Sequence, residues 1–94
     1  MSNSDYDEFM VYELDDSGER VRLEGITIDT LESILHPEQV VVIVREDLRR
    51  IYIWKGVKSP VRQRFISSRV AQQLQEELVK VAAFHRCKIV SIDQ

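Results

Sequence analysis

Hydrophobic residues follow two spacings along the chain, and these spacings predict its secondary structure. Val40–Val44 is an unbroken apolar run, which is typical of a strand buried on both faces. The next run alternates, so that Ile51 and Ile53 face one side of a strand and Tyr52 and Trp54 the other. Three further strands are expected, over Phe9–Leu14, Arg20–Leu23 and Lys88–Ile92.

Helical spacing marks two other segments. Thr27–Leu35 carries apolar residues three and four positions apart and predicts a short helix. Ser59 reads as an N-cap with Pro60 at the first helical position, so a long helix is expected from Pro60 to about Phe84. The predicted order of elements is therefore β-β-α-β-β-α-β.

The long helix has two apolar faces. Its sheet-facing stripe comprises Ile66, Val70, Leu74, Leu78, Val81 and Phe84. Nearly opposite lies a second strip, made of Val61, Phe65, Ser68, Gln72, Gln75 and Val79, and flanked by Arg62, Arg64, Arg69 and Glu76. An apolar centre with a charged rim is typical of a protein-binding surface. Two other interpretations stay open: Phe65 packs back over the Gly56–Ser59 loop, or the strip mediates self-association.

Composition limits the class of protein. The chain has 94 residues and a net charge of -3, which fits a single domain over residues 9–94 after a disordered acidic tail over residues 1–8. A nucleic-acid-binding role is not expected, since it usually needs a strongly basic face. No targeting segment or membrane span is recognisable, and the single Cys87 has no internal disulfide partner, so a cytoplasmic protein is expected.

Catalytic and metal-binding patterns are weak. His85 and Cys87 form a lone His-x-Cys pair, whereas metal sites usually use three or four ligands, and Cys87 is expected to be an inward strand residue. Asp15, Asp16 and Ser17 fit a hairpin turn better than a calcium loop. Asp5, Asp7 and Glu8 are expected to be solvated, and no catalytic constellation is recognisable. We therefore expect a non-enzyme without a metal or cofactor.

One stretch resembles a known family. "VVVIVREDLRRIYIWKGVKSPVRQRF" looks like the core signature of the gelsolin/severin/villin domain. In that signature, a buried strand leads to a strand ending in aromatic-x-Trp-x-Gly, which here runs from Tyr52 to Gly56, and then to a long helix. The resemblance spans about residues 9–92, and single small domains of this kind are similar to prokaryotic, especially archaeal, relatives.

The resemblance implies both a fold and a partner. The fold is an α+β three-layer α/β/α sandwich, with a mixed five-stranded sheet between one long and one short helix. The partner is actin or an actin-like cytoskeletal protein, bound by the exposed face of the long helix. The contacts implied by analogy are Val61, Phe65, Ser68, Arg69, Gln72 and Gln75, to which the second strip adds Val79. Arg69 departs from the pattern, because the family places a hydrophobic contact there.

The resemblance also bears on calcium. Family members with a calcium site use an aspartate before the third strand and a glutamate early in the long helix, where this chain has Gln39 and Gln63. Two neutral amides supply none of the negative charge that sets calcium affinity. We expect no such site unless Glu38 replaces Gln39 through a changed backbone register.

Two rival functions remain at the level of sequence. A homo-oligomer could form through the second strip, or through Phe9–Leu14 as an edge strand. An anionic-lipid or phosphoinositide role is suggested by a basic strand-to-helix junction, made of Arg49, Arg50, Lys55, Lys58, Arg62 and Arg64.

Overall fold

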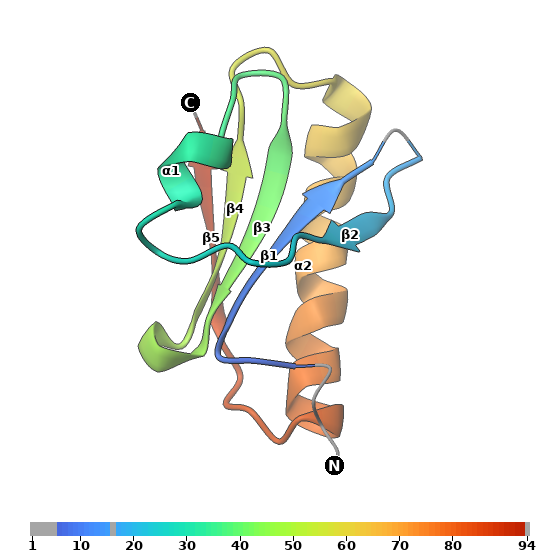
Figure 1. Ribbon diagram of the computed structural model, residues 1–94. Helices are drawn as coiled ribbons and strands as arrows, with labels where there is room; N and C mark the ends of the chain where they lie inside the picture. The colour runs from blue at the N-terminus through green and yellow to red at the C-terminus, as the bar shows by residue number, and fades with distance from the viewer. Residues whose placement is uncertain (1–5, 16, 94) are drawn as a thin grey trace.

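The computed structural model describes residues 6–15 and 17–93 and has the predicted order of elements (Figure 1). The strands and helices are β1 (Phe9–Leu14), β2 (Arg20–Arg22), α1 (Leu31–Ile34), β3 (Val40–Arg45), β4 (Arg50–Lys55), α2 (Val61–Val81) and β5 (Lys88–Asp93). A short 3-10 turn, Glu46–Leu48, joins β3 to β4.

The strands form one mixed sheet in the order β2-β1-β3-β4-β5. All neighbouring pairs are antiparallel except β4 and β5, which are parallel and are connected through α2. The mixed five-stranded sheet is thus confirmed. β1 is not an edge strand, since Tyr12 pairs with Arg22 of β2 on one side and Val42 of β3 on the other. The expectation of an edge at Phe9–Leu14 was wrong, and the edges are β2 and β5.

The two helices cover opposite faces of the sheet, which confirms the three-layer architecture (Figure 1). Under α2, core residues such as Met10 and Ile53 pack against Leu74 and Leu78 of the helix. On the other face, a smaller cluster joins buried residues of β1 and β3 to the α1 region and to Trp54. β3 is buried on both faces, as its unbroken apolar run predicts.

Both ends of α2 differ from the prediction. Ser59 does not cap the helix, because its Oγ donates to the carbonyl of Gly56 (2.7 Å) and closes the preceding turn. Pro60 occupies the cap position, and no side chain caps the helix there. At the other end the helix stops at Val81, since Ala83 adopts a left-handed conformation (φ 58°). Val81 is therefore exposed at the last turn rather than part of the core stripe.

α1 is shorter than the predicted Thr27–Leu35 helix. The Thr27 N–H donates to Thr30 Oγ1 (2.9 Å), and Thr30 Oγ1 in turn donates to the Thr27 carbonyl (3.2 Å). These bonds hold residues 27–30 in a turn, because a threonine hydroxyl competes with the helical pattern of backbone bonds. Only Leu31–Ile34 is helical.

The start of the described chain is tied to the domain. Tyr6 packs against the core beneath α2, and its hydroxyl donates to Glu77 Oε1 (2.7 Å). Arg22 donates to the Asp7 carboxylate (2.5 Å). The sequence predicted a disordered tail that includes Tyr6 and a solvated acidic cluster that includes Asp7. Both residues instead bond to the folded domain. The rest of that tail up to Asp5 lies outside the described residues, as does Asp16 of the predicted turn.

Candidate functional site

The outer face of α2 exposes two large apolar side chains. The helix buries Val70, Leu74 and Leu78 against the sheet, while Phe65 is 87% exposed and Val61 is 80% exposed. Helical geometry places residues four apart on the same side, so these two side chains are neighbours. Because both side chains are exposed, they make no contribution to the core, although burying an aromatic side chain is normally strongly favourable.

Phe65 does not pack over the preceding loop. That loop is closed by its own bonds, in which Lys58 N–H donates to the Pro37 carbonyl (2.7 Å) and Gly56 N–H to the Gln39 carbonyl (2.9 Å). With 87% of Phe65 accessible, the interpretation of Phe65 as a local staple was wrong.

The other residues of the second strip divide into two groups. Ser68, Arg69 and Gln72 are exposed beside Phe65, whereas Val79 is half-buried. Gln75 is engaged within the domain: its Nε2 donates to the Cys87 carbonyl (2.6 Å), and its Oε1 accepts from Arg86 (3.0 Å). The accessible outer face of α2 is therefore defined here as Val61, Phe65, Ser68, Arg69 and Gln72.

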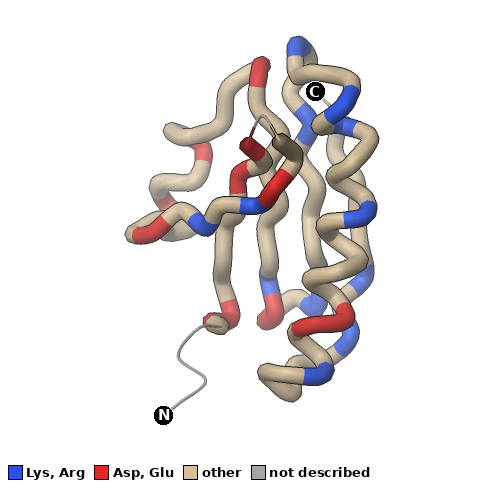
Figure 2. Tube along the Cα trace, turned by 90° about the vertical axis from the view of Figure 1, so that its right-hand side faces the viewer, with Lys and Arg blue, Asp and Glu red and all other residues tan. Residues whose placement is uncertain are grey.

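The six basic residues of the predicted junction form two groups rather than one. Arg49 and Arg50 lie at the start of β4, and Lys55 and Lys58 lie at or beyond its end, where α2 begins. A strand rises ~3.3 Å per residue, so β4 separates the groups by roughly 17 Å. Figure 2 likewise shows basic residues at both ends of the molecule.

At the α2 end, Arg62 is exposed beside the outer face, but Arg64 turns back. Its Nη1 donates to the Gly56 carbonyl (3.0 Å) and lies 3.4 Å from Ser59 Oγ. The cationic rim of the outer face is accordingly Arg62 and Arg69.

Among the residues that the structure describes, no helix combines the length and the apolar composition needed to cross a membrane.

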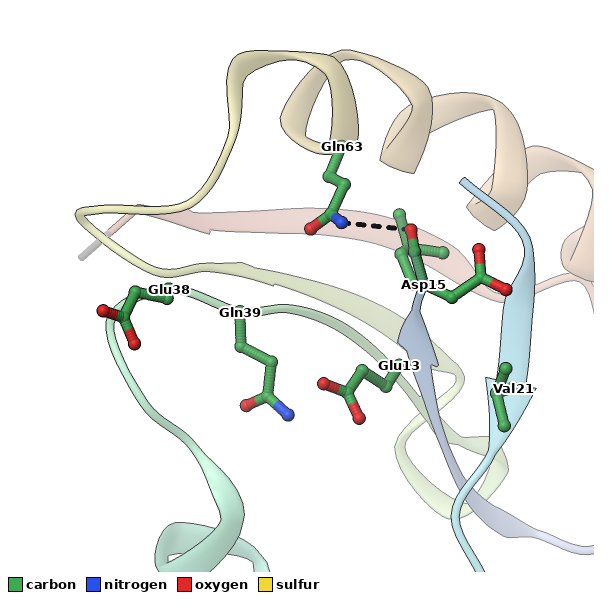
Figure 3. A pocket seen from close by; sticks show the side chains of 7 residues that line it. Glu13, Asp15, Val21, Glu38, Gln39 and Gln63 are labelled. Atoms are coloured by element: carbon green, nitrogen blue, oxygen red, sulfur yellow. Dashed lines mark hydrogen bonds between the residues drawn. The ribbon is translucent and has the colours of Figure 1, made fainter. Parts of the chain in front are cut away.

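Gln39 and Gln63, the positions matched to calcium ligands, meet at one cavity of about 330 Å³ (Figure 3). Both side chains are almost fully buried, with 5% of Gln39 and 6% of Gln63 exposed. Gln63 Nε2 donates to the backbone carbonyl of Asp15 (3.0 Å), which links the first turn of α2 to the β1–β2 hairpin. Gln39 and Glu13 lie side by side on the opposite wall, and Glu38 lines the rim (Figure 3).

The Asp15 carboxylate serves the hairpin turn. Asp15 Oδ1 accepts bonds from Ser17 Oγ (2.7 Å), Ser17 N–H (2.9 Å) and Glu19 N–H (2.9 Å). The hydrogen bond from Ser17 is the main reason why the pKa of Asp15 is lowered. The turn interpretation of this segment is confirmed. Among the described residues, no group of three or more His, Cys, Asp or Glu side chains is arranged to hold a metal ion.

His85 and Cys87 are brought together by a glutamate that lies far away in sequence. Glu46 Oε2 accepts from the His85 N–H (3.2 Å) and lies 2.9 Å from the ring Nδ1. Cys87 Sγ donates to Glu46 Oε1 (3.6 Å). Burial, and secondly this bond, raises the pKa of Cys87 to about 11. Cys87 is buried, as predicted, but it precedes β5 and is not part of the strand. A thiol with such a pKa is unreactive near neutral pH.

One surface feature, on the α1 side of the sheet, was not predicted from the sequence. Leu35 and Trp54 line two adjoining hollows, of about 340 Å³ and 260 Å³. The alternation in β4 places Tyr52 and Trp54 on one face, but it does not reveal that α1 is too short to cover them. Both remain half-buried.

Solved structures with the same fold include two archaeal proteins. Thorarchaeota ProGel, crystallised in a complex with rabbit actin, matches with a TM-score of 0.72 and 22% identity, over 92% of this chain and 85% of that chain. Thorarchaeota 2DGel3, also crystallised with rabbit actin, matches with a TM-score of 0.63 and 18% identity. That match covers 92% of this chain but 39% of 2DGel3. No family model and no curated protein matches the chain. The structural matches establish the same fold over nearly the whole of this chain.

Proposed function

Because the chain has a gelsolin-like fold, we propose that it is a non-enzymatic interaction domain that binds actin or an actin-like protein through the outer face of α2, without calcium. The exposure of Phe65 is the observation that carries this proposal. Aromatic side chains, Phe among them, are enriched in the buried cores of protein–protein interfaces.

The chemistry of the outer face suits insertion into a groove. Phe65 and Val61 provide the apolar contact, and the small Ser68 lets a partner surface approach the helix closely. Arg62 and Arg69 at the rim would steer an acidic surface into register, since rim charges act chiefly on association and specificity. ProGel and 2DGel3, which share the fold, were both crystallised with rabbit actin, and this supports actin as the class of partner.

Calcium independence is supported by the Gln63 contact. Its amide nitrogen is a hydrogen-bond donor aimed at the Asp15 carbonyl, so the hairpin and the helix are joined directly by a protein–protein bond. Gln39 and Gln63 carry no charge, and calcium affinity depends strongly on the number of charged ligands. In this proposal, the Gln63 bond fixes the start of α2 without an ion.

Sedimentation velocity with monomeric, magnesium-loaded rabbit actin tests the proposed function. We expect a one-to-one complex that forms equally well in calcium and in EGTA, because no contact of the proposed interface depends on a bound ion. A complex that forms only in calcium would contradict the proposed ion independence. The absence of a complex at concentrations up to ~100 µM, well above a micromolar affinity, would contradict actin binding itself.

A further inference from the structure

The two edges of the sheet are built differently. β2 has three residues, and its two arginines are engaged with acidic side chains: Arg20 with Glu77 (2.6 Å) and Arg22 with Asp7 (2.5 Å). Short, charged edges of this kind resist pairing with other strands. β5 has six residues, including Ile89, Val90 and Ile92, and β4 is its only neighbour in the described sheet. β5 is therefore the edge open to a further strand.

The hydrogen-bonding groups at this edge can be assigned. Lys88 N–H donates to the Arg49 carbonyl (2.9 Å), so it points towards β4. Since the direction of the backbone N–H alternates along a strand, those of Val90 and Ile92 also point to β4. The N–H groups of Ile89 and Ser91 then point away from the sheet, at the positions that an added strand would use.

An apolar surface leads to this edge on the α1 side. The smaller of the two hollows is lined by Leu35, Tyr52 and Trp54, and it extends to Ile92 of β5. Trp54 and Ile92 are register partners in the parallel pair, so their side chains lie on the same face. A large apolar side chain from an added strand would lie over this hollow on the same side of the sheet.

Charge at the beginning of β5 indicates what kind of strand would fit. Arg50 and Lys88 are register partners, and both side chains are exposed. Like charges directly opposite one another are destabilising in a sheet. No acidic side chain pairs with Lys88 among the residues that the structure describes. By the same alternation, these two cations lie on the face that carries Trp54.

We propose that the β5 edge and the adjoining hollow bind an extended segment of a partner protein, which adds to the sheet as a sixth strand. The segment carries large apolar residues at alternate positions, over Trp54, and on the same face an acidic residue that reaches Arg50 and Lys88. Backbone bonds to Ile89 and Ser91 provide affinity, while the hollow and the charges provide specificity. The site lies on the opposite side of the sheet from α2 and does not depend on the proposed function.

A designed peptide tests this site. The probe is a capped heptapeptide with aspartate at both ends, leucine at positions three and five, and threonine at the even positions, so that either strand direction presents an acid to Lys88. Trp54 is the only tryptophan of the chain, so its fluorescence reports binding directly. We expect a saturable change in emission, and roughly tenfold weaker binding when lysine replaces both aspartates. No change at millimolar peptide, or equal binding of the lysine peptide, would overturn the proposal.

Variants at the edge separate strand addition from contact with the hollow alone. Ser91→Pro removes an outward N–H without removing a bond to β4, so it should abolish peptide binding, whereas Ser91→Ala should retain it. Equal binding by Ser91→Pro would show that no strand is added. If circular dichroism shows that Ser91→Pro is unfolded, Lys88→Glu replaces it and should prefer the lysine peptide. An unchanged preference for the aspartate peptide would overturn the proposal.

Two further measurements identify the occupant and isolate the site. Phe65→Asp should bind the peptide as the wild-type chain does, because the outer face of α2 is not involved. Peptide binding lost in this variant would contradict two separate surfaces. Sedimentation of the chain alone should show a monomer. A different result would be a concentration-dependent dimer that Ser91→Ala retains and that Ser91→Pro or Lys88→Glu removes. In that case the occupant would be a second copy of this chain, and the proposal of a partner's segment would be overturned.

Discussion

At the scale of single residues, Gly56 is required because two backbone segments approach closely. A Cβ at this position would lie 2.2 Å from the Pro37 carbonyl oxygen and 2.9 Å from that of Gln39, distances that no side chain tolerates. The same approach lets the Gly56 N–H donate to the Gln39 carbonyl (2.9 Å). The glycine that ends the Tyr52–Gly56 motif is thus explained by packing of backbone on backbone.

Substitution of this residue should be costly. In Gly56→Ala, the turn must move away from Pro37. This movement would strain or break the bond from the Gly56 N–H to the Gln39 carbonyl and the bond from the Lys58 N–H to the Pro37 carbonyl. We expect a loss in the free energy of unfolding of about 2 kcal/mol or more, measured by urea denaturation. Gly25→Ala is a reference for a glycine at positive φ (74°) whose Cβ would contact nothing. A Gly56→Ala variant no less stable than Gly25→Ala would contradict the packing explanation.

At the scale of elements, sequence patterns predicted the strands and the helix types, because these depend on periodic burial against one sheet. They failed where a side chain bonds locally to the backbone. Ser59 closes a turn instead of capping α2, and Thr30 shortens α1. The exposed Phe65 was predicted from helical spacing, but the inward bonds of Gln75 and Arg64 depend on loops whose positions the spacing does not encode.

One long-range contact also escaped prediction: Glu46 holds the connection between α2 and β5. Its side chain is 12% exposed, and burial raises its pKa, but hydrogen bonds from His85 and Cys87 outweigh burial and lower it below the ordinary 4.5. The folded state therefore favours the carboxylate more than the unfolded state does. This stabilisation is present above the unfolded pKa and is lost as the pH falls through the lower, folded pKa.

Replacement of Glu46 should alter the dependence of stability on pH. Because Glu46→Gln cannot ionise, we expect it to be less stable than the wild-type chain at pH 6 and to lose less stability between pH 5 and pH 3. Thermal melts across this range provide the measurement. Glu24→Gln, on an exposed side chain, provides the control. If the two variants lost stability in parallel on acidification, the Glu46 contact would have no electrostatic role.

At the scale of the whole molecule, the sheet separates two surfaces of different character. One is the rigid outer face of α2, with Phe65 at its centre. The other is the β5 edge with the hollow at Trp54. Because the sheet and its core lie between them, one partner on each surface would not compete for space. The domain would then join an actin-like protein to a second protein.

Calcium is not expected to alter the stability of the whole domain. A ligand that binds only the folded state raises its stability in proportion to RT ln(1 + [L]/Kd). With Gln39 and Gln63 at the matched positions, we expect the same melting temperature in millimolar calcium and in EGTA. A Gln39→Asp/Gln63→Glu double variant should place carboxylates at the two matched positions, beside Glu13 and Glu38 in the cavity wall, and its melting temperature should increase with calcium. An increase in the wild-type chain would contradict the proposed calcium independence.

If the outer face of α2 is the surface that binds actin, replacing Phe65 by aspartate should weaken the affinity for monomeric rabbit actin. Ile28→Asp is the matched control, because Ile28 is also an exposed apolar residue (56%) but precedes α1. All three chains should fold equally well, since neither substituted side chain lies in the core. We predict binding by the wild-type chain and by Ile28→Asp, and at least ~tenfold weaker binding by Phe65→Asp. Equal affinities for all three chains would contradict the account.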